Sequence, residues 1–156
     1  MQYDHTQNAP LYLILVAVAI AMFIGGWLVP EPFVQTILLS SAGLMFLLAQ
    51  CFGRLTVSDE SDRLVICFGP LPLFRRRILY SDIDSVERSR TTILDGWGIH
   101  LSPSGGWTWN LWGFDCVDVY FKKGRKLRIG TDDPKGLESF LKQRVSQEVR
   151  AEGQRR

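Results

Sequence analysis

The first 53 residues contain no lysine or arginine, although the chain of 156 residues has 18 of these side chains. Asp4 and Glu31 are the only acidic residues in the same stretch. A secretory signal peptide begins with a basic segment, so this absence argues against one. The rest of the chain holds every basic residue, but its positive balance is too weak to indicate a nucleic-acid partner.

Histidine and cysteine are scarce as well. The two histidines, His5 and His100, are not sequence neighbours of any cysteine. The three cysteines, Cys51, Cys67 and Cys116, form no CxxC pair, which argues against a zinc site. We expect Cys67 and Cys116 to be small core residues, and nothing in the sequence supports acylation of Cys51.

No combination of residues indicates a catalytic site. The chain has no Ser-His-Asp or Cys-His arrangement, and Gly96 and Gly98 lack the rest of a dinucleotide-binding fingerprint. Asp82 and Asp84 would share one face of a strand, as an acid–base pair requires, but carboxylates at such a position more often cap a turn. We expect a protein without enzymatic activity, cofactor or metal ion.

Two long apolar segments, residues 11–29 and 33–52, occupy most of the stretch that lacks basic residues. A helix needs roughly 20 apolar residues to cross a bilayer core of about 30 Å. Pro30-Glu31-Pro32 separates the segments, and both proline and a carboxylate disfavour one continuous helix through a bilayer. We predict a two-span transmembrane hairpin over residues 11–52. A buried soluble hairpin is the alternative, disfavoured because both segments are apolar on every side.

Basic residues begin just after the second segment with Arg54, and the run Arg75-Arg76-Arg77 lies further along the chain. Because lysine and arginine favour the cytoplasmic side of a membrane, we expect both termini and the following domain to be cytoplasmic. Small residues in both segments, Gly25-Gly26 and Ser40-Ser41-Ala42-Gly43, favour close helix packing and are compatible with homo-oligomerisation. Neither segment holds an Asp, Glu, Lys, Arg or His side chain, which disfavours a transport function.

Residues 54–149 have the pattern of a mainly-β domain that ends in one helix. Short runs of alternating polar and apolar residues are separated by glycine, proline and acidic turns. Asp133 and Pro134 fit the N-cap and the first position of a helix, and apolar residues then recur at helical spacing. We expect residues 1–10 and 150–156 to be flexible polar tails.

Several short motifs accompany this order of hairpin, strands and helix. They are Tyr80-Ser81-Asp82-Ile83, Ser85-Val86, Asp95-Gly96-Trp97-Gly98-Ile99, Gly106-Trp107, Asn110, Trp112-Gly113, Val117, and Arg128-Ile129-Gly130-Thr131-Asp132-Asp133-Pro134 with Leu137. Over the whole chain the sequence resembles the bacterial pleckstrin-homology (PH)-like membrane proteins. The resemblance implies a seven-stranded PH-like barrel or sandwich capped by one C-terminal helix, in a multi-pass protein of the bacterial inner membrane. It implies no catalytic activity.

Four of the five tryptophans lie close together in the second half of the chain. They are Trp97, Trp107, Trp109 and Trp112, and on a strand Trp107 and Trp109 would share a face. Tryptophan favours boundaries between apolar and wet surroundings, at protein interfaces or membrane surfaces. We predict that this segment docks a protein partner, with contact to lipid headgroups and filling of the barrel core as the alternatives.

Two basic clusters are candidate contacts for anionic lipid. One holds Arg75, Arg76 and Arg77, and the other holds Lys122, Lys123, Arg125, Lys126 and Arg128. On a strand, Arg75 and Arg77 would share one face, and Arg76 would lie on the other. The alternative explanation is a positive-inside bias together with a solvated hairpin tip. Lipid-binding PH domains resemble one another in a basic first hairpin, but the corresponding turn here, Ser58-Asp59-Glu60-Ser61-Asp62, is acidic. That turn argues against a phosphoinositide at the usual place.

The sequence favours a non-enzymatic, membrane-anchored PH-like interaction module. It would serve a protein partner, or assemble with itself, as a scaffold or accessory at the inner membrane. A sensor of anionic lipid that uses the two basic clusters is the first alternative. An accessory subunit of a membrane enzyme or transporter is the second.

Overall fold

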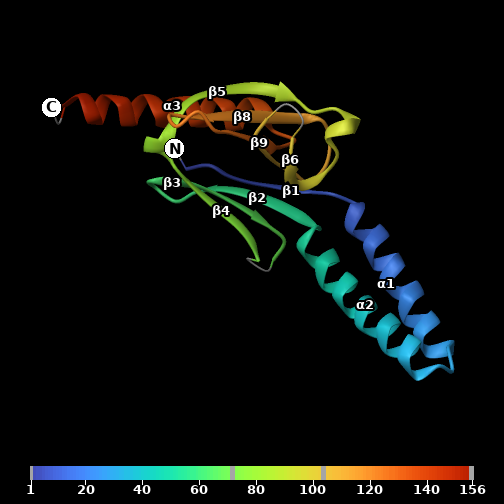
Figure 1. The fold of residues 1–156 in the computed structure, drawn as a ribbon. Helices are drawn as coiled ribbons and strands as arrows, with labels where there is room; N and C mark the ends of the chain where they lie inside the picture. The colour runs from blue at the N-terminus through green and yellow to red at the C-terminus, as the bar shows by residue number, and fades with distance from the viewer. Residues whose placement is uncertain (1, 71–72, 103–104, 155–156) are drawn as a thin grey trace.

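A computed structural model of the protein describes residues 2–70, 73–102 and 105–154. Two helices form an N-terminal hairpin, two β-sheets follow, and a third long helix ends the described chain (Figure 1). This order of hairpin, strands and helix is the one that the sequence predicts. The helices are α1 (Leu11–Leu28), α2 (Pro32–Cys51) and α3 (Pro134–Gln154), with two short 3-10 helices, η1 (Tyr80–Asp82) and η2 (Ile93–Asp95). The strands are β1 (Asp4–Asn8), β2 (Arg54–Asp59), β3 (Arg63–Phe68), β4 (Phe74–Leu79), β5 (Ile83–Arg90), β6 (Gly98–Leu101), β7 (Trp107–Asn110), β8 (Asp115–Phe121) and β9 (Lys126–Gly130).

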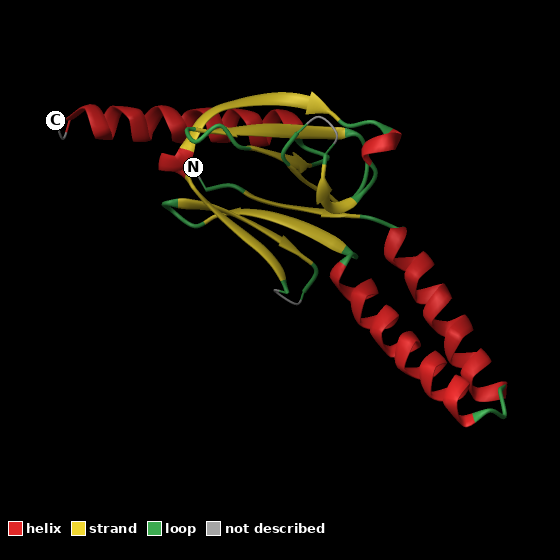
Figure 2. Cartoon of the chain, viewed as in Figure 1, coloured by secondary structure: helices red, strands yellow, loops and turns green. Residues whose placement is uncertain are grey.

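The helices α1 and α2 lie side by side and project away from the sheets as one arm (Figure 2). Gly26 permits their close approach, since a Cβ atom there would lie 3.1 Å from side-chain atoms of Leu38 and Leu39. Such contacts at small residues are typical of helix pairs in membranes. Pro32 occupies the first turn of α2, where its missing N–H removes no helical hydrogen bond.

Large apolar side chains are exposed around the whole hairpin, including Ile14, Phe23, Trp27, Phe33 and Leu44. Among the described helices, α2 is long and apolar enough to cross a membrane, whereas the apolar helix Tyr12–Leu28 is shorter. The chain therefore has at least one helix of spanning length near its N-terminus.

The β-domain consists of a four-stranded sheet in the order β1-β2-β3-β4 and a five-stranded sheet in the order β5-β8-β9-β7-β6. Neighbouring strands are antiparallel, except that β7 and β9 run parallel. The family resemblance implied seven strands, whereas the described residues form nine. One of the strands that the sequence did not predict is β1, which precedes the hairpin in the chain.

Strand β1 corrects the prediction of a flexible tail over residues 1–10. It pairs with β2 along its whole length, from Asp4 opposite Ser58 to Asn8 opposite Arg54. The polar sequence of β1 has no apolar alternation, so its pairing depends on the hairpin, which brings the segment alongside β2. The two strands that flank the hairpin are thereby hydrogen-bonded to each other at its base.

The strands define two ends of the β-domain. At the hairpin end, β1 stops and β2 starts. This end also holds η2, the β7–β8 loop and the start of α3. The Gln7 side chain donates a hydrogen bond to the Trp112 carbonyl and so joins β1 to the β7–β8 loop. The far end holds the β2–β3 turn, η1 and the β8–β9 turn. The Lys122 N–H donates to the Asp82 carbonyl there (3.0 Å). The helix α3 runs from the hairpin end toward the far end and beyond (Figure 1).

The core lies between the two sheets and under α3. Its fully buried side chains include Leu55, Leu64, Ile66, Phe68, Tyr80, Ile83, Val117, Leu127, Ile129, Leu137 and Leu141. The start of α3 is confirmed, because the Gly136 N–H donates to the Asp133 side chain (3.0 Å) in an N-cap. The helix continues to Gln154, so the expected tail over residues 150–156 is wrong for its described part.

Candidate functional site

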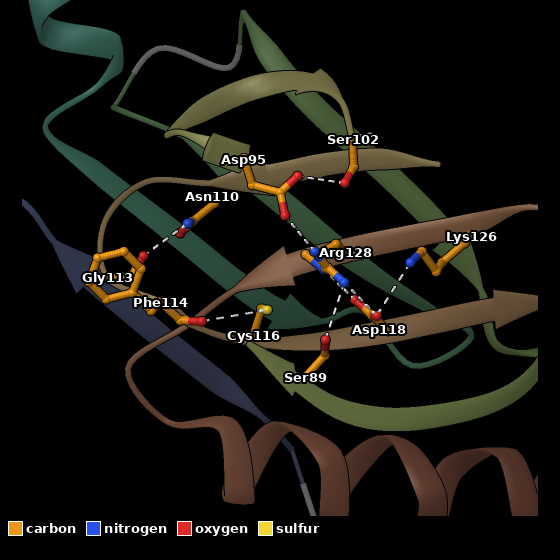
Figure 3. Close-up of polar contacts among 10 residues, drawn as sticks. All are labelled: Ser89, Asp95, Ser102, Asn110, Gly113, Phe114, Cys116, Asp118, Lys126 and Arg128. Carbon is orange, nitrogen blue, oxygen red and sulfur yellow. Dashed lines mark hydrogen bonds and ion pairs between the residues drawn. The ribbon is translucent and has the colours of Figure 1, made fainter. Parts of the chain in front are cut away.

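Arg128 lies in a cluster of charged side chains with Asp95, Asp118 and Lys126 (Figure 3). It is 6% exposed, and its guanidinium donates twice to Asp118, at 2.7 and 3.0 Å, and once to Asp95, at 2.9 Å. Lys126 lies 3.5 Å from the same Asp118 carboxylate. This placement corrects the assignment of Arg128 to a lipid-contact cluster, because a buried and paired guanidinium is not available to a headgroup.

The Arg128 cluster holds the connection from η2 to β6. Asp95, at the end of η2, accepts hydrogen bonds from Arg128 and from the Ser102 hydroxyl, the latter at 2.6 Å. The Ser102 hydrogen bond and, to a smaller extent, the Arg128 charge lower the pKa of the Asp95 carboxyl. Hydrogen bonding to Asp118 raises the pKa of Arg128 further above its usual value. The ionised cluster therefore fixes the segment that carries Trp97.

The tryptophan-rich segment is divided among three surroundings. Trp109 is 8% exposed and packs against Phe68 with ring centroids 5.8 Å apart. Trp109 therefore fills the core, which the sequence offered as the alternative to docking. It is not available to a partner and is no longer a candidate docking residue. Trp107 begins the same strand but is 43% exposed, at the far end. Trp97 and Trp112 meet at the hairpin end.

Trp97 and Trp112 form an exposed stack. Their ring centroids are 4.7 Å apart, and the two residues are 41% and 37% exposed. Ile93 and Phe114 lie in the same two loops and are also exposed. We call Ile93, Trp97, Trp112 and Phe114 the aromatic plate. The stacked rings of Trp97 and Trp112 offer apolar surface that can be buried against another molecule, and Ile93 and Phe114 add exposed apolar side chains on the same two loops.

Hydrogen bonds hold the aromatic plate in position. The Gly113 carbonyl accepts from the Trp97 indole N–H at 3.2 Å. It also accepts from the Asn110 amide at 3.1 Å (Figure 3). Gly113 has a φ of +82°, which side chains other than glycine rarely adopt. Gln7 donates to the Trp112 carbonyl at 2.9 Å and so fastens the loop to the strand that leads into α1. The plate is preformed and fixed relative to the hairpin.

The other basic residues converge from two parts of the chain. Strand β4 and the β8–β9 turn border a cavity of about 340 Å³, and a neighbouring cavity of about 650 Å³ shares Arg76 and Arg125 with it. We call the two cavities the basic cleft. Its charged lining residues are Arg76, Arg77, Asp82, Lys122, Lys123, Arg125 and Lys126. The sequence identifies the two clusters but not that they meet.

Arg76 is the inward-facing residue of its cluster. Alternation along β4 leaves Arg75 and Arg77 exposed on the opposite face, as predicted, and Arg75 pairs with Glu60. Arg76 is half-buried, and its guanidinium carbon lies 6.0 Å from the centre of the Trp109 ring. Burial and then the positive charge of Arg125 lower the pKa of Arg76. Within the described parts of the chain, no carboxylate forms an ion pair with Arg76.

The cysteines are free thiols. Cys116 is buried, as predicted, and burial raises its pKa to about 11. Cys67 is half-buried, and Cys51 is fully buried at the base of the hairpin, where the backbone of Gly69 packs against it. A side chain in that position is not accessible for acylation. The described residues contain no group of three or more His, Cys, Asp or Glu that could hold a metal ion.

Asp118 and Asn110 hold the candidate sites in place, and the sequence alone did not identify them. Asp118 lies between Val117 and Val119 in a strand that is buried on both faces. A carboxylate in such a strand requires a cation or several donors, and this signal was available in the sequence. The role of Asn110 depends on the conformation of the β7–β8 loop, which sequence spacing does not reveal.

No family model matches the chain, and no curated protein matches its sequence. The functional assignment therefore depends on the geometry of the aromatic plate, the basic cleft and the hairpin.

Proposed function

We propose that this protein is a membrane-anchored, non-enzymatic interaction module whose aromatic plate binds a protein partner at the cytoplasmic surface of a bacterial inner membrane. The observation that carries the proposal is the exposed Trp97–Trp112 stack, held by internal hydrogen bonds beside the base of an apolar hairpin. Preformed tryptophans are favoured in binding surfaces, because a large rigid ring buries much area at little cost in conformational entropy.

The exposed surface of the hairpin supports anchoring in a bilayer. Apolar side chains face outward on all sides of both helices, and a surface of this kind is stable in lipid rather than in water. The 18 residues of α1 rise about 27 Å, close to the thickness of a bilayer core. Trp27 and Phe33 lie exposed at the tip, where aromatic residues fit the membrane–water interface.

The pairing of β1 with β2 supports a fixed orientation of the domain on the membrane. Asn8 and Arg54 are paired residues, and each lies close to one helix of the hairpin. Both helices thus pass into neighbouring strands without a flexible linker. A domain mounted in this way keeps the aromatic plate near the bilayer surface. This height favours a partner that is itself a membrane protein, or a second copy of this chain.

The two sheets with one C-terminal helix are compatible with a PH-like domain. Arg54 at the base of the hairpin favours cytoplasmic termini through the positive-inside rule. The turn between β2 and β3 argues against phosphoinositide binding at the usual PH position. Its carboxylates are acceptors for arginine, since Glu60 pairs with Arg75 and Asp62 pairs with Arg63.

Crosslinking of the tagged full-length protein in its native membrane, followed by mass spectrometry, tests the proposal. The comparison is between the wild type, the double variant Trp97→Ala/Trp112→Ala, and the control Trp107→Ala, which removes an exposed tryptophan at the other end of the domain. We expect a stoichiometric protein partner, or a defined homo-oligomer, with the wild type and the control, and loss of most of it with the double variant.

Two outcomes would contradict the proposal. Recovery of monomeric wild type with lipids alone would indicate that the aromatic plate contacts headgroups rather than protein. Equal recovery of the partner with all three forms would place the docking surface elsewhere on the molecule. Far-ultraviolet circular dichroism of each purified form checks that the fold is retained.

A further inference from the structure

The basic cleft holds an inward-facing arginine, Arg76, for which the described residues supply no carboxylate partner. Its first cavity is lined by basic residues of β4 and of the β8–β9 turn and by one acidic residue, Asp82. Removal of a charge from water is unfavourable, so buried cations in proteins are normally paired with carboxylates. Arg128 follows this rule with two carboxylates. Arg76, which also points into the domain, has none among the described residues.

The surroundings of Arg76 increase the imbalance. The Trp109 ring lies on one side of its guanidinium, and the charge that acts on it is the second cation, Arg125. Two guanidinium groups at one cavity repel each other, and an anion placed between them removes the repulsion. The pair is therefore arranged for a negatively charged ligand.

We infer that the basic cleft is a binding site for a phosphorylated anion, held by the guanidinium groups of Arg76 and Arg125. The planar guanidinium matches the geometry of phosphate and binds it through paired hydrogen bonds. A phosphate monoester carries more than one negative charge at neutral pH, which suits this excess of cations better than one carboxylate does. The cavity volume of about 340 Å³ lies in the range typical of small-molecule sites.

The position of the basic cleft distinguishes it from a contact with the bilayer that holds the hairpin. A six-residue strand such as β2 spans roughly 20 Å from the hairpin end to the far end. The Debye length at physiological ionic strength is about 8 Å, so anionic lipid around the hairpin attracts the β8–β9 turn only weakly. A free phosphorylated compound, or the headgroup of a second membrane, presents the same chemistry. The inference goes beyond the proposed function, because it concerns other residues, from the middle of β4 and from the β8–β9 turn at the far end.

Titration of the full-length protein with inorganic pyrophosphate tests the inference. The protein is held in phosphatidylcholine nanodiscs, because β1 precedes the hairpin and the domain is complete only in the whole chain, and heat of binding is measured. We expect saturable binding that weakens at least about tenfold in Arg76→Gln and in Arg125→Gln, since each removes a charged hydrogen-bond donor. Arg150→Gln, at the exposed end of α3, makes the same charge change and should bind as the wild type does.

A second arm identifies the source of the phosphate. The same nanodiscs are floated with vesicles that contain phosphatidic acid or only phosphatidylcholine. Binding to phosphatidic acid vesicles alone, lost in the two cleft variants, would support the site with a headgroup as ligand. No binding of the wild type to either probe, or equal binding by all four forms, would overturn the inference. Arg125 lies on an exposed turn, so its variant keeps the test informative if Arg76→Gln does not fold.

Discussion

Arg128 and Arg76 both point from a β-strand into the β-domain, but only the charge of Arg128 is paired with carboxylates. Arg128 is enclosed and meets two carboxylates, one of them through two hydrogen bonds. Arg76 lies half-buried at a cavity beside another arginine. The first arrangement stabilises the fold and leaves no charge for a ligand. The second leaves a positive charge uncompensated, which is typical of a binding site rather than of a structural support.

The two ends of the β-domain also differ in the kind of surface that they offer to a ligand. At the hairpin end, the Trp97 indole N–H of the aromatic plate donates to the Gly113 carbonyl, and the exposed rings offer apolar surface. The basic cleft, which extends from the middle of β4 to the β8–β9 turn at the far end, offers charge. An apolar surface near the hairpin suits a partner at the membrane, and a charged cavity at the far end suits a small anion from the aqueous phase. The following predictions separate these structural and functional roles.

Replacement of Arg128 should have the largest effect. Arg128→Met leaves Asp118 buried without its main partner, and the loss of one member of a buried ion pair costs about 3–5 kcal/mol. Urea denaturation of the full-length protein in detergent micelles, followed by tryptophan fluorescence, measures the change in free energy of unfolding. An unchanged free energy would show that the cluster is solvated and that the contrast with Arg76 is wrong.

The two tryptophans of β7 should differ strongly in how much they contribute to the free energy of unfolding. Trp109→Ala removes a core side chain and should lower the free energy of unfolding by about 3–5 kcal/mol. Trp107→Ala removes an exposed side chain and should change it by less than about 1 kcal/mol. Thermal unfolding of the two variants under identical conditions compares them. Equal losses would mean that Trp107 also belongs to the core.

The aromatic plate should contribute little to stability and much to binding. Trp112→Ala loses a stacking interaction of about 0.5–1.5 kcal/mol, a small fraction of what Trp109 contributes. Recovery of the crosslinked partner, normalised to the amount of folded protein, should fall by a larger factor than stability does. A parallel decline in both quantities would assign the plate a structural role.

Acid should weaken the Arg128 cluster through Asp95. The pKa of Asp95 is lower in the folded protein than in the unfolded chain. Its ionised form therefore stabilises the fold above the unfolded value of about 3.9, and this stabilisation is lost as the pH falls through the folded pKa. Urea midpoints measured from pH 6 downward should fall less steeply in Asp95→Asn than in the wild type. Identical slopes would contradict the assignment.

The smallest effect is expected for Arg76. Arg76→Met removes a half-buried charge that has no carboxylate partner in the described parts of the chain, so the free energy of unfolding should change by less than about 0.5 kcal/mol or should rise. The same urea experiment measures it beside Arg128→Met. A loss as large as that of Arg128→Met would reveal a hidden structural role for Arg76 and would remove the basis of the anion site.

Local patterns predicted the parts of this fold that depend on neighbouring residues. The hairpin follows from two apolar segments around Pro30-Glu31-Pro32, and the start of α3 follows from Asp133 and Pro134. Strand β1 was missed because its polar sequence has no period and its partner strand lies beyond two helices. The end of α3 was missed because its last residues are polar and project past the sheet.

The candidate sites were predicted only in part, since they depend on contacts between distant segments. Tryptophan spacing identified the unusual segment, but burial of Trp109 and exposure of Trp112 are set by the packing of β7. Alternation correctly separated Arg76 from Arg75 and Arg77. The partners of Arg128 and the meeting of Arg76 with Arg125 arise from strand order, which spacing along the chain does not encode.

Site-specific photocrosslinking from the aromatic plate tests the central claim most directly. A photoreactive phenylalanine derivative replaces Trp112 in the full-length protein, with the same substitution at Glu87, exposed on β5, as the control, and native membranes are irradiated. The account predicts a discrete protein adduct from position 112 and none from position 87. Adducts with lipid alone, or the same protein adduct from both positions, would contradict it.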